Sequence, residues 1–199
     1  MKKLLLATTN KGKIRELHSI LDSLGVDLVT PADMGLNLEV HEDGSTYAEN
    51  ATKKAIAFAQ ASGLTSLADD SGLEVDALDG APGLYSARYS PKPGANDKDR
   101  RDFLLRNLAN APHPWTARFR ATVAVAGPGG GVEWAEGICE GEIISEERGT
   151  GGFGYDPIFL LPELKQTMAE LPEATKNRLS HRARAVQAAR PILMRIFGF

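Results

Sequence analysis

Two adjacent carboxylates, Asp69 and Asp70, directly follow a short segment, residues 65–68, that is expected to form a strand. Neighbouring acids are costly to fix in one place unless a cation or a proton offsets their repulsion. Ser71 and Gly72 favour a turn, so we expect the strand to end here and the acids to lie on an exposed rim, where catalytic groups are often placed. The stretch indicates a metal site or an acidic surface turn, and by itself it is more typical of the turn.

Composition restricts the class of protein. The chain has 199 residues, of which 42% are hydrophobic, so it can bury a full core, and we expect one domain over residues 1–199. A net charge of −3 argues against an extended basic face, and hence against a nucleic acid polymer as partner. The apolar run at residues 4–6 is too short for a signal peptide or a membrane span, and the single cysteine, Cys139, fits a reducing compartment. We therefore expect a cytoplasmic protein without a membrane partner.

The first strand, turn and helix include a candidate anion site. Residues 3–8 are predicted to form a buried strand, and apolar residues then recur at helical spacing. The turn between them carries hydroxyls, an amide and two lysines beside a helix N-terminus, which favours anions. These residues are Thr8, Thr9, Asn10, Lys11, Gly12 and Lys13. They are equally consistent with phosphate binding and with a helix that Asn10 merely caps. The P-loop pattern is absent, because Ile14 follows Lys13.

The next predicted helix is preceded by an acidic segment, residues 39–44. Thr46 and Glu49 have the spacing of a capping box. Since capping accounts for Glu49, Glu42 is the preferred candidate in this segment for a metal ligand. Lys54 lies in the first half of the helix, a position at which most lysines are simply solvated.

The middle third of the chain is predicted to be scaffold. A helix with an apolar stripe is expected over residues 97–108. Two apolar segments, residues 119–126 and 132–138, flank a Gly-Pro-Gly-Gly-Gly stretch and are therefore predicted to form a β-hairpin. Residues 86–90 are expected to form a polar loop.

The glycine-rich segment at residues 149–157 satisfies the dinucleotide-binding spacing Gly-x-Gly-x-x-Gly literally. That interpretation fails, because a helix should follow and residues 158–161 instead resemble a strand. A better interpretation is a loop whose backbone approaches a ligand closely, with Phe153 and Tyr155 available to stack on a base and Asp156 able to bind donor groups on its edge. An ordinary aromatic-glycine loop explains the segment alone slightly better.

The C-terminal third combines Lys176 with Ser180, His181 and Arg182. Ser180 is a natural N-cap, which puts two cationic side chains in the first turn of a helix. The helix dipole disfavours cations there unless an anion or an acidic partner is present, and such an inconsistency often marks a functional site. Pro191 is expected to bend this helix or to begin a separate turn.

Five separated motifs occur in order along nearly the whole chain, and together they are far more specific than any one of them. They are Thr-Thr-Asn-x-Gly-Lys at 8–13, Ala-Asp-Asp-Ser-Gly at 68–72, Ser-Ala-Arg-Tyr at 86–89, the glycine-rich loop at 149–157 and Lys-x4-His-Arg at 176–182. With these motifs the chain strongly resembles the ITPase/Ham1 family of non-canonical purine nucleoside triphosphate pyrophosphatases. The resemblance implies an α/β fold: an elongated mixed β-sheet with flanking helices, forming two lobes around a central substrate cleft. It also implies hydrolysis of dITP, ITP and XTP to the monophosphate and pyrophosphate, a Mg²⁺ requirement and a homodimer.

The resemblance implies roles for single positions as well. Asp70 corresponds to the proton acceptor and to a metal ligand, and residues 8–13 correspond to the triphosphate-binding turn. Many relatives have two acids where this chain has His41 and Glu42, and the metal role is assigned to Glu42. The other substrate-binding positions are Lys54, Ser71, Phe153, Gly154, Tyr155, Asp156, Lys176, His181 and Arg182.

These roles combine into a hypothetical mechanism. Mg²⁺ held by Asp70 and Glu42, with Asp69 as an optional third carboxylate, would bridge the phosphates, and nearby lysines would hold the phosphate tail. Asp70 would orient or deprotonate the attacking water. A 6-oxo purine accepts a hydrogen bond where the amino group of adenine donates one, so donors from the glycine-rich loop or from His181 and Arg182 would disfavour ATP.

Two other functions are compatible with the same residues. One is a related enzyme that hydrolyses damaged pyrimidine or methylated nucleotides. The other is a regulatory protein that binds a nucleotide without cleaving it, which the retained acids and lysines disfavour. The products formed from a panel of nucleotides distinguish the three.

Overall fold

The structure, a computed structural model, describes residues 2–199 and divides into two compact units. The first comprises the residues up to Asp70, together with Ala121–Gly137 and His181–Phe199, and the second comprises Ser71–Arg120 and Ile138–Ser180. One seven-stranded sheet has the strand order β2-β1-β3-β4-β5-β6-β7. Three of its strands have residues in both units: β3 (Thr65–Val75), β4 (Trp115–Ala126) and β5 (Val132–Ile143).

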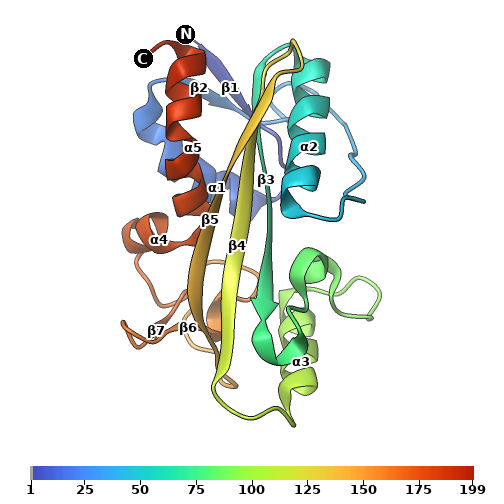
Figure 1. Cartoon of the computed structure of the whole chain (residues 1–199), viewed down its shortest axis with the longest axis vertical. Coiled ribbons are helices and arrows are strands. Elements are labelled where there is room, and N and C mark those ends of the chain that lie inside the picture. Colours follow the sequence, from blue (N-terminus) through green and yellow to red (C-terminus); the bar gives the residue numbers. More distant parts are fainter. Residues whose placement is uncertain (1) are drawn as a thin grey trace. The chain divides into compact units, whose positions relative to one another are not determined.

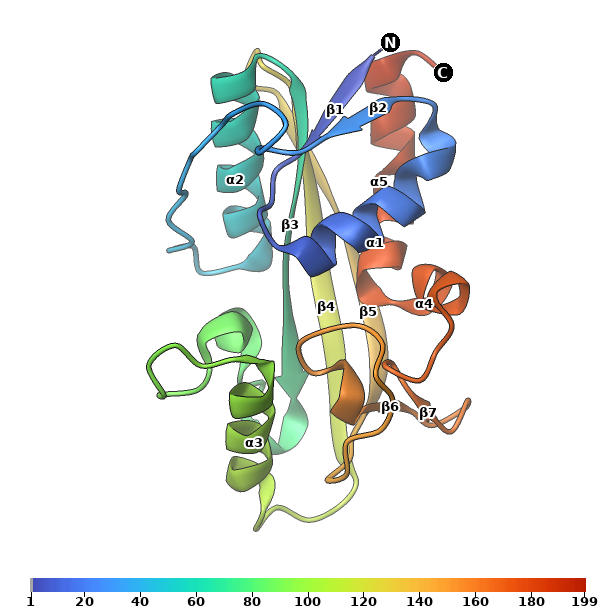
Figure 2. The same ribbon diagram turned by 180° about the vertical axis from the view of Figure 1, so that it is seen from behind.

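The first unit is built on parallel strands. Its further elements are β1 (Lys3–Leu6), α1 (Lys11–Leu21), the 3-10 helix η1 (Asp22–Leu24), β2 (Asp27–Val29), α2 (Tyr47–Ser62) and α5 (His181–Phe197). Strand β1 pairs in parallel with β2 and with β3. Helices α1 and α5 lie on one side of these strands and α2 lies on the other (Figures 1 and 2).

Alternation along β1 explains this three-layered packing. Leu4 and Leu6 are buried in the cluster that includes residues of α1 and α5, whereas Leu5 is buried in the cluster formed with α2. Successive side chains of a strand point to opposite faces, so a strand covered on both faces needs a continuous apolar run. The run of leucines at the start of the chain is therefore a central strand, as predicted.

Side chains cap the two helices that precede the candidate site. The Asn10 side chain accepts hydrogen bonds from two amides in the first turn of α1, so the capping interpretation of this residue is confirmed. Thr46 accepts from the amide of Glu49 at the start of α2, as expected. The carboxylate of Glu49, however, accepts from the amide and hydroxyl of Ser45, one residue before the partner that a capping box predicts.

The second unit combines antiparallel strands with two α-helices and three 3-10 helices. Its further elements are the 3-10 helices η2 (Asp76–Leu78), η3 (Gly83–Arg88) and η4 (Asp156–Ile158), the strands β6 (Phe159–Leu161) and β7 (Gln166–Thr167), and the helices α3 (Asp97–Leu108) and α4 (Glu173–Leu179). Strand β6 pairs in antiparallel fashion with β5 and β7. Leu104 and Leu108 of α3 are fully buried in the core cluster of this unit, together with Phe159 of β6.

Strand β3 does not end where the sequence predicted. Residues 65–68 were expected to be followed by a turn, but β3 continues to Val75, so Asp69 and Asp70 lie inside the strand. Leu73 and Val75 are fully buried. Burying these two side chains keeps the backbone extended and outweighs the local turn preference of Ser71 and Gly72.

Other elements differ from the prediction in extent. The β4–β5 hairpin and the strand after the glycine-rich loop are confirmed, although β4 begins earlier and β5 ends later than predicted. The expected polar loop at residues 86–90 is mostly the 3-10 helix η3. Helix α4 was not predicted, and Pro191 lies inside α5, which continues to Phe197 rather than starting a separate turn.

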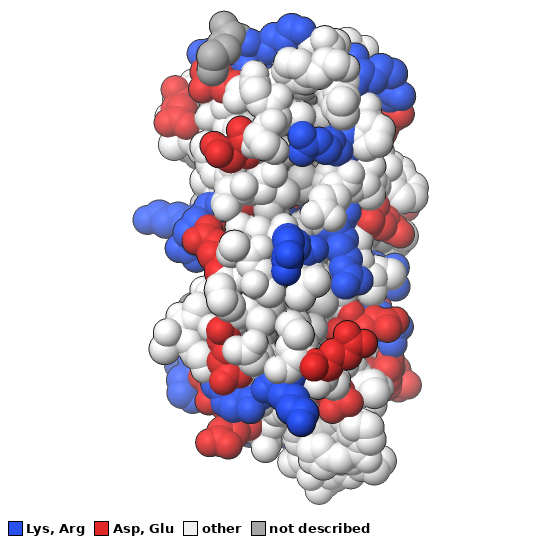
Figure 3. Space-filling model, turned by 90° about the vertical axis from the view of Figure 1, so that its left-hand side faces the viewer, with Lys and Arg blue, Asp and Glu red and all other residues white. Residues whose placement is uncertain are grey.

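One face of the molecule carries charges of both signs. On the face shown in Figure 3, Lys and Arg side chains are interspersed with Asp and Glu side chains. Among the helices of residues 2–199, none combines the length and the apolar character that crossing a membrane requires.

Candidate functional site

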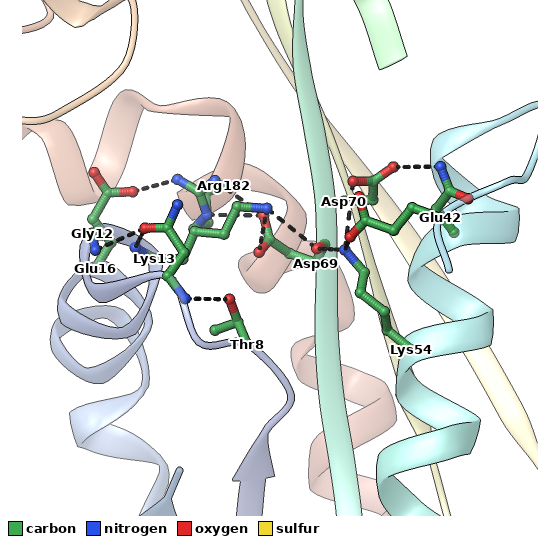
Figure 4. A network of polar contacts seen from close by, with 11 residues as sticks. Thr8, Gly12, Lys13, Glu16, Glu42, Lys54, Asp69, Asp70 and Arg182 are labelled. Atoms are coloured by element: carbon green, nitrogen blue, oxygen red, sulfur yellow. Dashed lines mark hydrogen bonds and ion pairs between the residues drawn. The ribbon is translucent and has the colours of Figure 1, made fainter. Parts of the chain in front are cut away.

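The two central acids belong to different groups of charges. Asp69 and Asp70 follow each other in β3, so their side chains point to opposite sides of the strand (Figure 4). Asp69 contacts Lys13 of α1 and Arg182 of α5, whereas Asp70 contacts Lys54 of α2. The structure thus resolves the repulsion between the acids by giving each its own cationic partner.

Asp69 is the centre of a buried ionic network. Its Oδ2 atom lies 3.0 Å from both Nε and Nη2 of Arg182, and its Oδ1 atom lies 3.2 Å from Nζ of Lys13. Arg182 also donates to Glu16 of α1, and its side chain is only 2% exposed. Burial alone would raise the pKa of Asp69, but Arg182, Lys13 and Lys54 together lower it far below its usual value. Asp69 is therefore an anchor for Lys13 and Arg182, and because each of its oxygens already lies beside one of these cations, it is poorly placed to bind a metal beside Asp70.

Lys54 joins the carboxylates on the opposite side of β3. Its Nζ atom donates to Glu42 Oε1 at 2.7 Å and to the carbonyl oxygen of Asp69 at 2.7 Å, and it lies 3.5 Å from Asp70 Oδ1. Burial acts to lower the pKa of Lys54, but Asp70, Asp69 and Glu42 outweigh it and raise the pKa. Glu42 and Asp70, from distant parts of the sequence, thus converge on one cationic centre.

Asn50 fixes the orientation of Asp70. Its amide nitrogen donates to Asp70 Oδ2 at 3.1 Å, and its amide oxygen accepts from the backbone amide of Gly44 at 2.8 Å. Asn50 therefore connects Asp70 to the segment that carries Glu42. Burial raises the pKa of Asp70, with Lys54 and Lys13 partly opposing the rise. A carboxylate with a raised pKa is a better proton acceptor near neutral pH than an exposed one.

The donor set around Asp70 fits a magnesium ion. Lys54, Lys13 and Arg182 face four carboxylates, those of Glu16, Glu42, Asp69 and Asp70, so the ionised cluster carries one excess negative charge. Within residues 2–199, no three His, Cys, Asp or Glu side chains are gathered as a ready metal cage. Mg²⁺ characteristically uses one or two carboxylates and completes its shell with water and substrate phosphates, so Glu42 and Asp70 would be enough protein ligands for such an ion.

The turn before α1 presents part of its surface to solvent next to this cluster. Thr9, Asn10 and Lys11 are exposed, and Thr8 Oγ1 accepts from the amide of Asn10 at 3.2 Å. Burial lowers the pKa of Lys13, and the neighbouring cations lower it further, although Asp69 opposes them. A phosphate group beside Lys13 would stabilise the charged form of this lysine and so raise its lowered pKa.

The second unit contains a smaller group of predicted site residues. Asp156 Oδ2 accepts from Lys176 Nζ at 2.7 Å and from the amide of Phe153 at 2.8 Å, and Lys176 Nζ lies 5.4 Å from the centre of the Phe153 ring. A Cβ atom on Gly152, whose φ is +74°, would lie 2.0 Å from Asp156 Oδ2. Only glycine therefore allows the loop to close over this ion pair.

The structure corrects the role predicted for Tyr155. This side chain is 4% exposed and belongs to the core of the second unit, and its hydroxyl donates to the carbonyl oxygen of Ser86 at 2.8 Å. Burial raises its pKa. Tyr155 is therefore a core residue that cannot stack on a base, because its ring is covered by protein, and Phe153 is the aromatic residue of the pair that is partly exposed.

The remaining predicted residues have these places. Ser71 follows Asp70 in β3 but belongs to the second unit, and His181, 6% exposed, is the first residue of α5 in the first unit. Gly137 of β5 lets the first turns of α5 approach, because a Cβ atom there would lie 2.2 Å from the carbonyl oxygen of His181 and 2.3 Å from the amide nitrogen of Ala185. The first unit thus brings together Lys13 of the 8–13 turn with Glu42, Lys54, Asp70 and Arg182, and the second brings together Phe153, Asp156 and Lys176.

Sequence reasoning missed two residues of the network, Glu16 and Asn50. Each lies about one helical turn from a predicted cation, Glu16 after Lys13 on α1 and Asn50 before Lys54 on α2. Residues three or four apart share a helix face, so a search for polar residues at that spacing would have found both.

Comparisons with known proteins identify the family of this chain. The model of the Ham1 family matches residues 4–192. Two similar proteins are named dITP/XTP pyrophosphatase: that of Desulforamulus reducens is 50% identical over 98% of this chain and 97% of its own, and that of Geobacter sulfurreducens is 51% identical over 94% of each. Among solved structures, the HAM1 protein of Coxiella burnetii superposes with a TM-score of 0.87 at 37% identity, over 98% of this chain and 100% of its own. The Ham1 protein of Staphylococcus aureus gives 0.84 at the same identity and coverage. The predicted α/β architecture, a mixed sheet with flanking helices, is thereby confirmed, and the chain belongs to the Ham1 family.

Proposed function

We propose that this protein hydrolyses the non-canonical purine nucleoside triphosphates dITP, ITP and XTP to the nucleoside monophosphate and pyrophosphate. The observation that carries the proposal is the convergence of Glu42 and Asp70 on Lys54, beside the exposed turn at residues 8–13. The similar proteins of Desulforamulus reducens and Geobacter sulfurreducens are named dITP/XTP pyrophosphatase, which supports the same activity.

The reaction needs an aligned water molecule and charge neutralisation rather than a covalent intermediate. In the proposed step the water oxygen forms a bond to the α-phosphorus, the bond from that phosphorus to the bridging oxygen breaks, and the water proton passes to the Asp70 carboxylate. The amide of Asn50 binds one oxygen of Asp70, and the other lies 3.5 Å from Lys54 Nζ. We assign this second oxygen to the reacting water. Pyrophosphate is the leaving group.

Cations of the first unit would stabilise the charge that develops on the phosphates. Lys13 and Lys54 are already directed at carboxylates of the cluster, and Lys11 is exposed at the start of α1. Fixed positive groups contribute most where charge increases in the transition state. We assign these lysines to the triphosphate.

A magnesium requirement is part of the proposal. Bound by Glu42 and Asp70, Mg²⁺ would supply Lewis-acid neutralisation of the phosphate oxygens. Glu42→Gln is expected to weaken binding of Mn²⁺, used as a paramagnetic substitute and followed by its EPR signal, by about tenfold or more. Glu39→Gln, an exposed acid in the same segment, is the matched control. Equal Mn²⁺ affinity in the wild type and Glu42→Gln would contradict the ligand assignment.

We assign base recognition to the second unit. Phe153 offers a partly exposed ring, and Asp156 and Lys176 offer an acceptor and a donor in one ion pair. A purine with a 6-oxo group requires a donor where adenine requires an acceptor, and a buried mismatch costs about 1–3 kcal/mol. We therefore expect ATP to be a poor substrate.

The test is a product assay with ITP, XTP, dITP, ATP and GTP, with and without Mg²⁺. We expect pyrophosphate from the first three only when Mg²⁺ is present. Orthophosphate as the first product, or preferential hydrolysis of damaged pyrimidine or methylated nucleotides, would contradict the proposal. Binding of ITP without turnover would instead indicate the regulatory alternative.

Three properties implied by the family complete the proposal. We propose that the protein is a homodimer, that it acts in the cytoplasm on small nucleotides, and that residues 1–199 form one domain with two lobes. Light scattering after size-exclusion chromatography tests the dimer, and the coincidence of unfolding transitions from the two units tests the single domain.

A further inference from the structure

Helix α3 binds both backbone polar groups of one residue in the glycine-rich loop, the amide and the carbonyl of Gly154. Asp97 Oδ2 accepts from the backbone amide of Gly154 at 2.8 Å, and Arg101 Nη1 donates to the carbonyl oxygen of Gly154 at 2.7 Å. Asp97 and Arg101 are four residues apart in α3, so they lie on one face of the helix, one turn apart. One helix face thus fixes the two peptide planes on either side of Gly154.

Arg101 is itself held in a fixed position. Its Nε and Nη2 atoms donate to the two carboxylate oxygens of Glu147 at 2.9 and 3.0 Å, and the residue is 9% exposed. A bidentate pair of this kind defines the plane as well as the place of the guanidinium group. Glu147 lies shortly before the glycine-rich loop in the sequence, so Arg101 connects α3 both to this residue before the loop and to Gly154 within it.

Asp97 is connected to a second segment. Its Oδ1 atom pairs with Arg100, which donates to the carbonyl oxygen of Ala87 at 3.1 Å and to that of Ala95 at 2.9 Å. The Tyr155 hydroxyl adds a contact to Ser86. Helix α3 therefore joins the loop at residues 149–157 to the segment around η3.

The loop needs such support because of its composition. Gly154 has φ of +62°, and no atom lies within 4 Å of where its Cβ atom would be, so glycine serves the backbone conformation there rather than a close approach. Glycine loses more conformational freedom on ordering than other residues, so fixing its backbone has an entropic cost. Two hydrogen bonds to charged groups offset that cost.

The geometry points to Asp97 and Arg101 as positioning residues that determine affinity for the purine base by holding Gly154, the neighbour of Phe153, without touching the nucleotide themselves. This inference rests on the proposed function, in which Phe153 and Asp156 bind the base. It distinguishes the two ends of the substrate: loss of the support should affect the base and leave binding of the phosphates unchanged.

The test compares Asp97→Ala and Arg101→Lys with two controls on the same helix. The controls are Asp102→Ala, which alters a carboxylate that pairs with Lys98, and Arg106→Lys, which alters an arginine that contacts the Phe103 ring. Neither Asp102 nor Arg106 makes the bonds to Gly154 described above. We expect Asp97→Ala and Arg101→Lys to raise KM for ITP and XTP about three- to tenfold with kcat within about twofold of the wild type. The inhibition constant of inorganic tripolyphosphate, which has no base, should not change, and both controls should match the wild type.

Asp97→Asn retains a side-chain oxygen and is expected to restore most of the affinity that Asp97→Ala loses. Hydrogen exchange of residues 149–157 provides a measurement without substrate, and it should accelerate in Asp97→Ala but not in Asp102→Ala. The inference is overturned if KM is unchanged in folded Asp97→Ala and Arg101→Lys, or if tripolyphosphate binding weakens as much as ITP binding. A wild-type protein that hydrolyses neither ITP nor XTP would overturn the proposed function instead, and exchange in the loop would still report on the support by α3.

Discussion

At the scale of single residues, the pKa values of the adjacent acids Asp69 and Asp70 are shifted in opposite directions. Asp69 is held ionised by Arg182 and Lys13, whereas burial raises the pKa of Asp70. Strand alternation produces this difference, because it directs one side chain toward α1 and α5 and the other toward α2. Environments that separate the pKa values of two neighbouring groups commonly assign them different roles, here a structural anchor and, in the proposed reaction, a proton acceptor.

Asp70→Asn should abolish activity and stabilise the fold. Loss of the proton acceptor is expected to lower kcat by about a hundredfold or more. The pKa of Asp70 is raised in the folded protein, so ionisation of this carboxyl disfavours folding. In the metal-free wild type, the free energy of unfolding should therefore fall as the pH rises from the usual pKa of aspartate through the raised pKa of Asp70. This component should vanish in Asp70→Asn. Urea unfolding in the presence of EDTA at several pH values measures it, with exposed Asp22→Asn as the control.

Arg182→Met should strongly destabilise the first unit. Removing the guanidinium group leaves Asp69 and Glu16 buried without their main partner, and breaking a buried pair in this way costs about 3–5 kcal/mol. Arg190→Met, on the exposed side of the same helix, should change the free energy of unfolding by about 0.5 kcal/mol or less. Similar unfolding midpoints for the two variants in urea would contradict a structural role for the Asp69 network.

At the scale of secondary-structure elements, the close approach of α5 to β5 determines the position of the Arg182 backbone, from which its side chain reaches Asp69. The helix backbone passes so close to Gly137 that a Cβ atom would overlap the carbonyl oxygen of His181 and the amide nitrogen of Ala185. Backbone atoms cannot move aside as the end of a flexible side chain can. The glycine is therefore required by the packing of the two elements.

Gly137→Ala should displace the first turn of α5 or prevent it from docking. The expected loss is about 1–3 kcal/mol or more, the usual range for an overpacked interior site. Gly127→Ala is a matched control, because no atom lies within 4 Å of the corresponding Cβ position and its φ is not in the left-handed region. A thermal melt in which both variants unfold at the same temperature would show that the close approach is unimportant.

Elements whose limits depend on local chemistry were predictable from the sequence. The cap at Asn10, the limits of α3 and the strand after the glycine-rich loop follow from short-range signals. The end of β3 was not predictable, because burial of Leu73 and Val75 by distant residues overrides the turn preference of Ser71 and Gly72. For the same reason the divergence of Asp69 and Asp70 could not be seen, since it requires the strand to continue.

At the scale of the whole molecule, the sequence motifs separate into two groups. Residues 8–13, Glu42, Lys54, Asp70 and Arg182 belong to the first unit, where charged groups dominate, and the glycine-rich loop and Lys176 belong to the second. The order of motifs along the chain indicated the family, whereas the hydrogen-bond partners that fix them, such as Asn50 and Asp97, could only come from the fold. Long-range contacts select these partners, and no local pattern encodes them.

The central claim is that water attacks the α-phosphorus with Asp70 as proton acceptor. Hydrolysis of ITP by the wild-type protein with Mg²⁺ in ¹⁸O-labelled water, followed by mass spectrometry of both products, tests this most directly. The proposed reaction predicts one ¹⁸O atom in inosine monophosphate and none in pyrophosphate when water makes a single attack at the α-phosphorus. Label in pyrophosphate, or release of orthophosphate as the first product, would contradict it.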